Sequence, residues 1–98
     1  PLKGIFVSNA WTHSIARSVR ALSVAKGVTI IGYDLVPKNL QYLEQGLIGF
    51  LISQCPSTQG YEGIYCLYEH VVLRQKVKHT IMVPVDILTK NNVKYYQG

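Results

Sequence analysis

The sequence predicts an α/β fold in which a parallel sheet carries helices on both faces. Three short apolar runs, at 4–9, 28–34 and 47–54, alternate with segments whose apolar residues recur at helical spacing. Nearly continuous apolar runs are typical of strands that are buried on both sides of a parallel sheet. The alternation of strands and helices favours parallel pairing through right-handed crossovers.

Two helices are expected between these strands. The first covers 12–25, with Thr12 as its N-cap and Gly27 as its stop, and its apolar residues share one face. The second is short, because Pro37 opens it and Gly46 ends it. Both would pack their apolar faces on the sheet.

A longer helix begins at Pro56, and its apolar and aromatic residues form one stripe. The last strand is expected over 80–89. Pro84 lies within it and removes a ladder donor, so this strand should lie at the edge of the sheet or be interrupted there.

Composition excludes several classes of protein. The chain of 98 residues fits one small domain, and its net charge of +5 comes from scattered basic residues without a run, which disfavours direct binding to nucleic acid. No apolar run approaches the ~20 residues of a membrane helix, so no membrane partner is expected. Cys55 and Cys66 are the only cysteines, which points to a reducing compartment and therefore to the cytosol.

Three of the predicted strands end in a polar side chain: Asn9, Asp34 and Gln54. Ligands of parallel α/β sheets bind beyond the carboxyl ends of the strands. A carboxylate beside two amides matches the hydroxyls of a polyol, which both donate and accept hydrogen bonds. Trp11 or Tyr33 would supply a flat apolar face for a sugar ring. The alternative is that these residues only cap helices or shape turns.

The sequence offers no set of catalytic residues. His13, His70 and His79 lie far apart, and neither they nor the cysteines have the spacing of a zinc site. The glycines match no phosphate-binding pattern. We therefore expect no enzyme activity, no metal and no cofactor, whereas His13, near a helix start, is a candidate ligand contact.

Four segments carry a resemblance to a known family: 4–9, 31–37, 51–61 and 84–92. Their order and spacing resemble the C-terminal third of type I periplasmic sugar-binding proteins. The sensor domain of the lactose-repressor (LacI) family of bacterial transcription regulators shares that fold. The chain is accordingly expected to be a C-terminal fragment of a ligand-sensing domain.

The resemblance implies that Asn9, Asp34 and Gln54 contact the ligand, which are the residues that the strand-end argument selects. The family usually has an acidic residue after the first asparagine, whereas Ala10 stands here. Trp11 and His13 belong to an unusual stretch that would reshape the mouth of the pocket.

The resemblance also implies two lobes that close on the ligand. Residues 1–54 would then belong to the C-terminal lobe, the helix of 56–79 would pack on the other lobe, and 80–98 would be the return strand and tail. An isolated fragment would expose the apolar face of that helix. We therefore expect a homodimer or a domain-swapped oligomer.

The function expected from these observations is effector sensing in a LacI-type regulator. A sugar would close the cleft and control DNA binding by a helix-turn-helix domain that is absent from this chain. The alternative is a periplasmic sugar-binding protein that serves a transporter or a sensor kinase.

Overall fold

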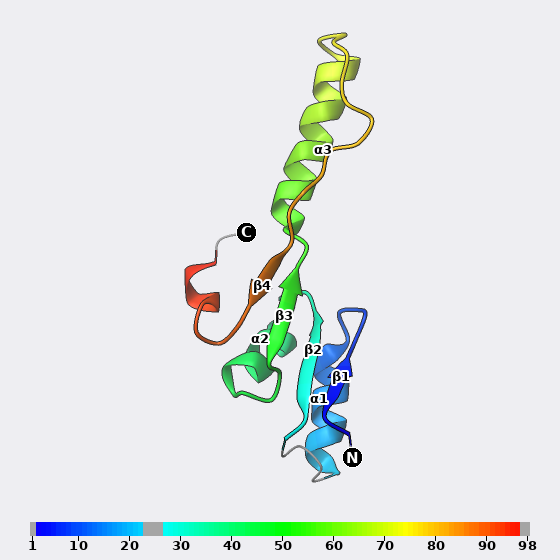
Figure 1. The fold of residues 1–98 in the computed structure, drawn as a ribbon. Coiled ribbons are helices and arrows are strands. Elements are labelled where there is room, and N and C mark those ends of the chain that lie inside the picture. The colour runs from blue at the N-terminus through cyan, green and yellow to red at the C-terminus, as the bar shows by residue number, and fades with distance from the viewer. Residues whose placement is uncertain (1, 23–26, 97–98) are drawn as a thin grey trace.

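The computed structural model describes residues 2–22 and 27–96, and Figure 1 shows the order of its elements. They are β1 (Gly4–Phe6), α1 (Thr12–Ala21), β2 (Thr29–Tyr33), α2 (Pro37–Glu44), β3 (Phe50–Ser53), α3 (Pro56–Val71), β4 (Asp86–Leu88) and the 3-10 helix η1 (Val93–Tyr95).

The four strands form one sheet in the order β1-β2-β3-β4. β1 pairs with β2 and β2 with β3 in parallel, which confirms the predicted pairing of the first three strands. β4 lies at the edge, as Pro84 predicts, but it runs antiparallel to β3. Its direction is reversed because the chain leaves β3 and returns to β4 at the same end of the sheet (Figure 1).

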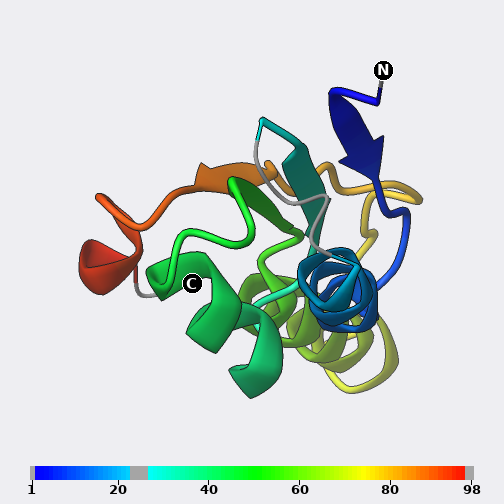
Figure 2. The same ribbon diagram turned by 90° about the horizontal axis from the view of Figure 1, so that it is seen from below.

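The core lies between the sheet and the two short helices, as Figure 2 shows. Its buried residues come from α1, β2, α2, the loop after α2 and β3: Ala16, Val19, Ile30, Tyr42, Leu43, Ile48 and Leu51. The α/β fold class is confirmed, but in the described residues both α1 and α2 pack on the same face. Two right-handed crossovers that step in the same direction across a sheet place their helices on one side. On the other face, Phe6, Phe50 and Ile87 are exposed.

Helix α1 lies very close to β2. A Cβ atom added at Gly32 would lie 1.8 Å from Thr12 Oγ1, so only glycine permits this approach. The N-cap prediction for Thr12 is wrong, because Trp11 occupies the cap position and Thr12 is the first helical residue. The side chain of Thr12 is buried, and its hydroxyl donates to the carbonyl of Asn9.

The first helix is shorter than predicted, since α1 ends at Ala21. The remainder of the predicted 12–25 helix includes residues 23–26, which lie outside the described residues. Gly27 adopts the left-handed conformation, with φ 79°, just before β2.

Residues 56–85 form an arm that projects from the rest of the molecule, here called the body (Figure 1). The helix predicted over 56–79 ends at Val71, and of the strand predicted over 80–89 only Asp86–Leu88 is formed. Because of the arm, the radius of gyration is 17.4 Å, whereas a compact chain of this length has about 13 Å.

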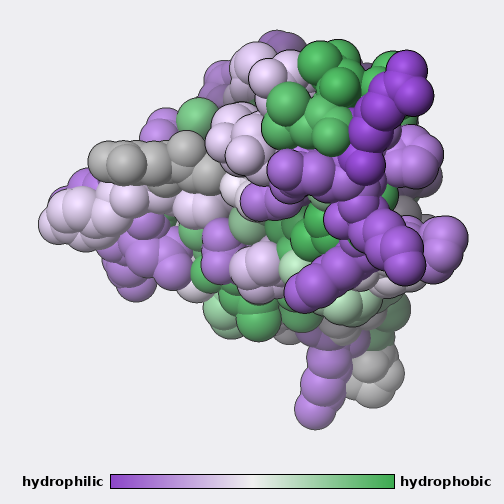
Figure 3. Space-filling view, turned by 90° about the horizontal axis from the view of Figure 1, so that it is seen from above, coloured by the Kyte–Doolittle hydropathy of each residue, from purple (hydrophilic) through white to green (hydrophobic). Residues whose placement is uncertain are grey.

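The arm has no core of its own. No residue of α3 is buried. Viewed from the end of the arm, apolar side chains reach the surface as patches between hydrophilic ones (Figure 3). No helix in the described part of the chain has the length and apolar character needed to cross a membrane.

Candidate functional site

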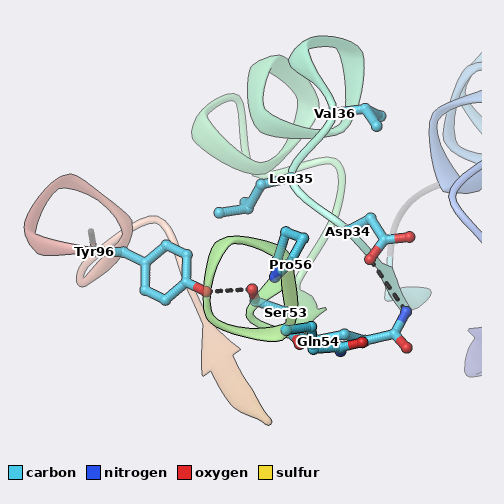
Figure 4. Close-up of a pocket in the computed structure, with 8 residues that line it drawn as sticks. Asp34, Leu35, Val36, Ser53, Gln54, Pro56 and Tyr96 are labelled. Carbon is cyan, nitrogen blue, oxygen red and sulfur yellow. Dashed lines mark hydrogen bonds between the residues drawn. The ribbon is translucent and has the colours of Figure 1, made fainter. Parts of the chain in front are cut away.

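Asp34 and Gln54 meet at the carboxyl ends of β2 and β3. The amide Nε2 of Gln54 donates to Asp34 Oδ1 over 3.2 Å (Figure 4). The backbone N–H of Asp34 donates to the carbonyl of Ile52 over 2.9 Å, which extends the β2–β3 ladder by one step. Asp34 then turns the chain with φ 74°, a conformation that aspartate tolerates better than most residues. The pairing of β2 with β3 therefore brings the backbone of Asp34 close to that of Gln54.

A hollow of about 570 Å³ lies beside this pair. It is bounded by the strand ends, the start of α2, the base of the arm and the C-terminal tail (Figure 4). Its lining residues are Asp34, Leu35, Val36, Ser53, Gln54, Pro56, Gln59 and Tyr96. The lining is mixed, with hydrogen-bonding groups from the strand ends and apolar groups from the loop before α2. Such a surface suits a small molecule that has hydroxyls and apolar faces.

Asn39, on the first turn of α2, holds the loops around the site together. It is 0% exposed. Its amide Nδ2 lies 3.0 Å from the carbonyls of both Tyr33 and Asp34, and 3.1 Å from that of Ala10. Its Oδ1 accepts from the backbone N–H of His13 over 2.8 Å. One buried side chain thus ties the loop after β1 to the turn that carries Asp34.

The same contact fixes the tautomer of His13. His13 Nδ1 lies 3.0 Å from Asn39 Oδ1, and an amide oxygen only accepts, so Nδ1 carries the proton. In the neutral imidazole, Nε2 is then a hydrogen-bond acceptor. Trp11 is 67% exposed and stacks on His13, with 5.6 Å between the ring centroids. Ligand contacts by Trp11 and His13 stay predictions, since neither side chain lines the hollow beside Asp34.

Asn9 lies in the same loop, three residues beyond the end of β1. Its Oδ1 accepts from the backbone N–H of Trp11 over 2.8 Å, so part of its hydrogen-bonding capacity shapes the turn. Asn9 does not line the hollow. The structure therefore brings Asp34 and Gln54 together directly and places Asn9 in a neighbouring loop that Asn39 connects to them. A ligand contact by Asn9 also stays a prediction.

Sequence reasoning missed Asn39, Ser53 and Tyr96. Asn39 is a single polar residue on a short helix, and its partners are mainly backbone carbonyls, which leave no mark in a sequence. Ser53 directly precedes Gln54, and that position next to a predicted contact was an available signal. The hydroxyl of Tyr96 bonds Ser53 Oγ (Figure 4). Partial burial raises the pKa of the Tyr96 hydroxyl above its ordinary value, while the hydrogen bond to Ser53 opposes this shift.

The polar groups at the strand ends are hydrogen-bonding groups. In the described residues, no group of three or more His, Cys, Asp or Glu side chains lies close enough together to hold a metal ion. The carboxylate of Asp34 accepts hydrogen bonds, and the amide of Gln54 both donates and accepts them. Such groups are able to hydrogen-bond the hydroxyls of a polar molecule.

The fold is an α/β fold of the kind that binding proteins use, with polar groups at the carboxyl ends of its parallel strands. The model of the periplasmic binding protein domain family matches residues 1–75, so the chain belongs to that family. Membership in a family of binding domains agrees with the prediction of a binding element that is not an enzyme.

Individual relatives include both transport proteins and a regulator. The chain is 27% identical to the xylose/arabinose-binding protein XylF of Sulfolobus acidocaldarius, over 97% of this chain and 25% of that protein. A protein from Bacteroides fragilis assigned to the LacI transcriptional regulators is 34% identical over 97% of this chain and 32% of that one, with a TM-score of 0.88. An ABC transporter periplasmic solute-binding protein from Actinobacillus succinogenes 130z, with bound D-allose, is 25% identical. The match covers 96% of this chain and 33% of that one, with a TM-score of 0.87.

The chain therefore spans about a quarter of the length of the curated relative and about a third of the solved structures. The solute-binding proteins among these relatives favour the alternative function over the expected regulator. The regulator remains a candidate because of the similar structure from B. fragilis.

Proposed function

We propose that this chain forms one wall of a monosaccharide-binding cleft in a solute-binding protein of the periplasmic binding protein family. The observation that carries the proposal is the Asp34–Gln54 pair at the edge of the hollow. An ionised carboxylate accepts short, strong hydrogen bonds from hydroxyls, and the adjacent amide donates to and accepts from the neighbouring hydroxyls. Adjacent hydroxyls on a sugar ring would meet both groups at once.

The relatives support a sugar as the ligand class. One is named for binding xylose and arabinose, and another holds D-allose. The apolar residues Leu35, Val36 and Pro56 on the wall of the hollow supply surface for the C–H groups of such a ring.

Two observations favour a second lobe in the complete protein. The face of α3 carries exposed apolar and aromatic side chains, and the chain spans only about a third of its solved relatives. We propose that the remainder of the complete protein covers this face and supplies the opposite wall of the cleft. A sugar that contacts both walls would favour the closed state through its higher affinity for that state.

The test is Asp34→Ala in the complete protein. Loss of a charged partner for hydroxyls should weaken sugar binding by about 2–4 kcal/mol, which is roughly 30- to 700-fold in Kd. A thermal-shift screen against a monosaccharide panel that includes D-allose, xylose and arabinose identifies the ligand, and calorimetry then measures Kd. Glu44→Ala removes an exposed carboxylate at the end of α2 and is the matched control. Unchanged affinity in Asp34→Ala would contradict the assignment.

The second candidate is the sensor domain of a LacI-type regulator, which the structure from B. fragilis favours. The sugar site would be the same, and the cytosolic location expected from the cysteines goes with this candidate. The preceding sequence of the complete protein discriminates between the two: a helix-turn-helix supports the regulator, and a secretory signal supports the transport protein.

A further inference from the structure

Four side chains form a polar cluster where the arm joins the body. Ser53 Oγ bonds the hydroxyl of Tyr96 and accepts from the backbone N–H of Cys55 over 3.2 Å. The thiol of Cys55 donates to Asp86 Oδ2 over 3.3 Å, and the hydroxyl of Tyr96 lies 3.6 Å from Cys55 Sγ. We call these residues the junction cluster.

The junction cluster links three separate segments of the chain. Ser53 is the last residue of β3, and Asp86 is the first residue of β4 and its pairing partner in the sheet. The chain passes from body to arm just after Ser53 and returns just before Asp86. Tyr96, from the C-terminal tail, therefore contacts the chain where it leaves the body at Ser53 and Cys55, next to Asp86, where the chain returns to the body.

Two members of the cluster, Ser53 and Cys55, are the residues directly before and after Gln54 in the sequence. Ser53 is 2% exposed and Cys55 is 5% exposed. The hydrogen bond between Ser53 Oγ and the Cys55 N–H is buried, and the bonds to Tyr96 and Asp86 are partly buried. Cys55 adopts φ 52° and ψ 59°, a left-handed conformation that is unfavourable for a residue with a side chain. The contacts of the cluster hold this conformation, and it directs the chain from β3 into α3. The backbone on either side of Gln54 is thereby fixed.

We propose that Tyr96 is a positioning residue for the ligand site: its hydroxyl holds the Ser53–Cys55 connection so that the Gln54 amide faces the carboxylate of Asp34. Tyr96 also lines the hollow beside that pair. The C-terminal tail thus helps to position a residue of the site, although it is distant from Asp34 in the sequence. The expected effect of Tyr96 on sugar affinity rests on the proposed function. Its expected effect on the orientation of Gln54 is independent of that function.

The test is Tyr96→Phe in the complete protein, with two measurements. The first is the NMR signal of the Gln54 side-chain amide without ligand, which reports its hydrogen bond to Asp34. The second is sugar affinity by calorimetry. We expect the Gln54 amide signal to move to the position of a glutamine side chain that lacks this hydrogen bond, and the affinity to fall about tenfold, as the loss of one partly buried hydrogen bond implies.

Two further variants complete the design. Tyr95→Phe removes the neighbouring hydroxyl, and since Tyr95 is 74% exposed it should change neither measurement. Ser53→Ala removes the partner of Tyr96 and should shift the Gln54 signal in the same direction, which also serves if Tyr96→Phe does not fold. A general loss of stability would not move this amide signal in a protein that remains folded.

The outcomes separate this inference from the proposed function. If the Gln54 signal in Tyr96→Phe and in Ser53→Ala coincides with that of the unmodified protein, the inference is wrong, whatever the sugar data show. If the unmodified protein binds no sugar of the panel, the proposed function fails, and the amide signal still decides the role of Tyr96.

Discussion

Helices α1 and α3 both follow a parallel strand, and both carry apolar side chains at helical spacing, yet their surroundings differ completely. In α1, Ala16 and Val19 are buried against the sheet and α2. In α3, no residue is buried, and Ile64 is 70% exposed. A periodic apolar pattern thus indicates that a helix has a partner, but it does not say whether the partner belongs to the same segment of sequence. In the body the partner is present, and for the arm we propose that it lies in the rest of the protein.

The test with the largest expected effect compares one leucine in the body with one in the arm. Leu51→Ala empties a 0%-exposed position in β3 and should lower the free energy of unfolding by about 3 kcal/mol. Leu67→Ala lies on the exposed face of α3 and should change it by less than about 0.5 kcal/mol in the 98-residue chain.

Chemical denaturation measures both variants, and repeating Leu67→Ala in the complete protein sharpens the comparison. A clear loss there, absent from the shorter chain, would place a partner over the arm. Equal losses for the two leucines in the 98-residue chain would mean that the arm has a core of its own.

A second test uses glycines. In Gly32→Ala, the new Cβ would overlap the side chain of Thr12, so α1 must move away from β2, at a loss of about 2 kcal/mol. Gly60→Ala is the matched change in α3, where nothing lies within 4 Å of the new atom. Alanine favours a helix over glycine by up to about 1 kcal/mol, so this variant should be neutral or more stable. Thermal unfolding that ranks the two in the opposite order would refute the close packing of α1 on β2.

The smallest expected effect concerns the loops of the body. Asn39→Ala removes the side chain that joins the loop after β1 to the turn at Asp34, and it leaves the partly buried N–H of His13 without its partner. We expect a loss of roughly 1.5 kcal/mol in stability together with weaker sugar binding. Gln41→Ala, at an exposed position of the same helix, is the control for both. If calorimetry and denaturation give the same values for the two variants, Asn39 does not organise the site.

The sequence was informative where local patterns decide structure. The apolar runs and helical periods of the body predict β1, α1, β2, α2 and β3 in the right order, and the strand-end rule selects Asp34 and Gln54. The direction of β4 was not predictable from such patterns, because it depends on the path of the arm in space. The position of α1 and α2 on one face follows from the sense of both crossovers across the sheet, which the pattern of apolar residues does not encode.

The contacts of the site were less accessible to sequence reasoning. Asn39 acts through backbone carbonyls, and Tyr96 meets Ser53 across 43 positions of the chain. Such pairings leave no periodic signal. Asn9, which the strand-end rule also selects, lies beyond the end of β1 in a turn that its own side chain supports.

The antiparallel pairing of β3 with β4 has a topological consequence. Ser53 and Asp86 are opposite each other in the ladder, so the two strands form a hairpin, and everything between them is an insertion into its loop. Lengthening an already long loop costs little conformational entropy, because that cost grows only with the logarithm of loop length. Changes of length at the far tip of the insertion therefore leave the register of the hairpin untouched, and evolution can remodel one end of the molecule without rebuilding the other.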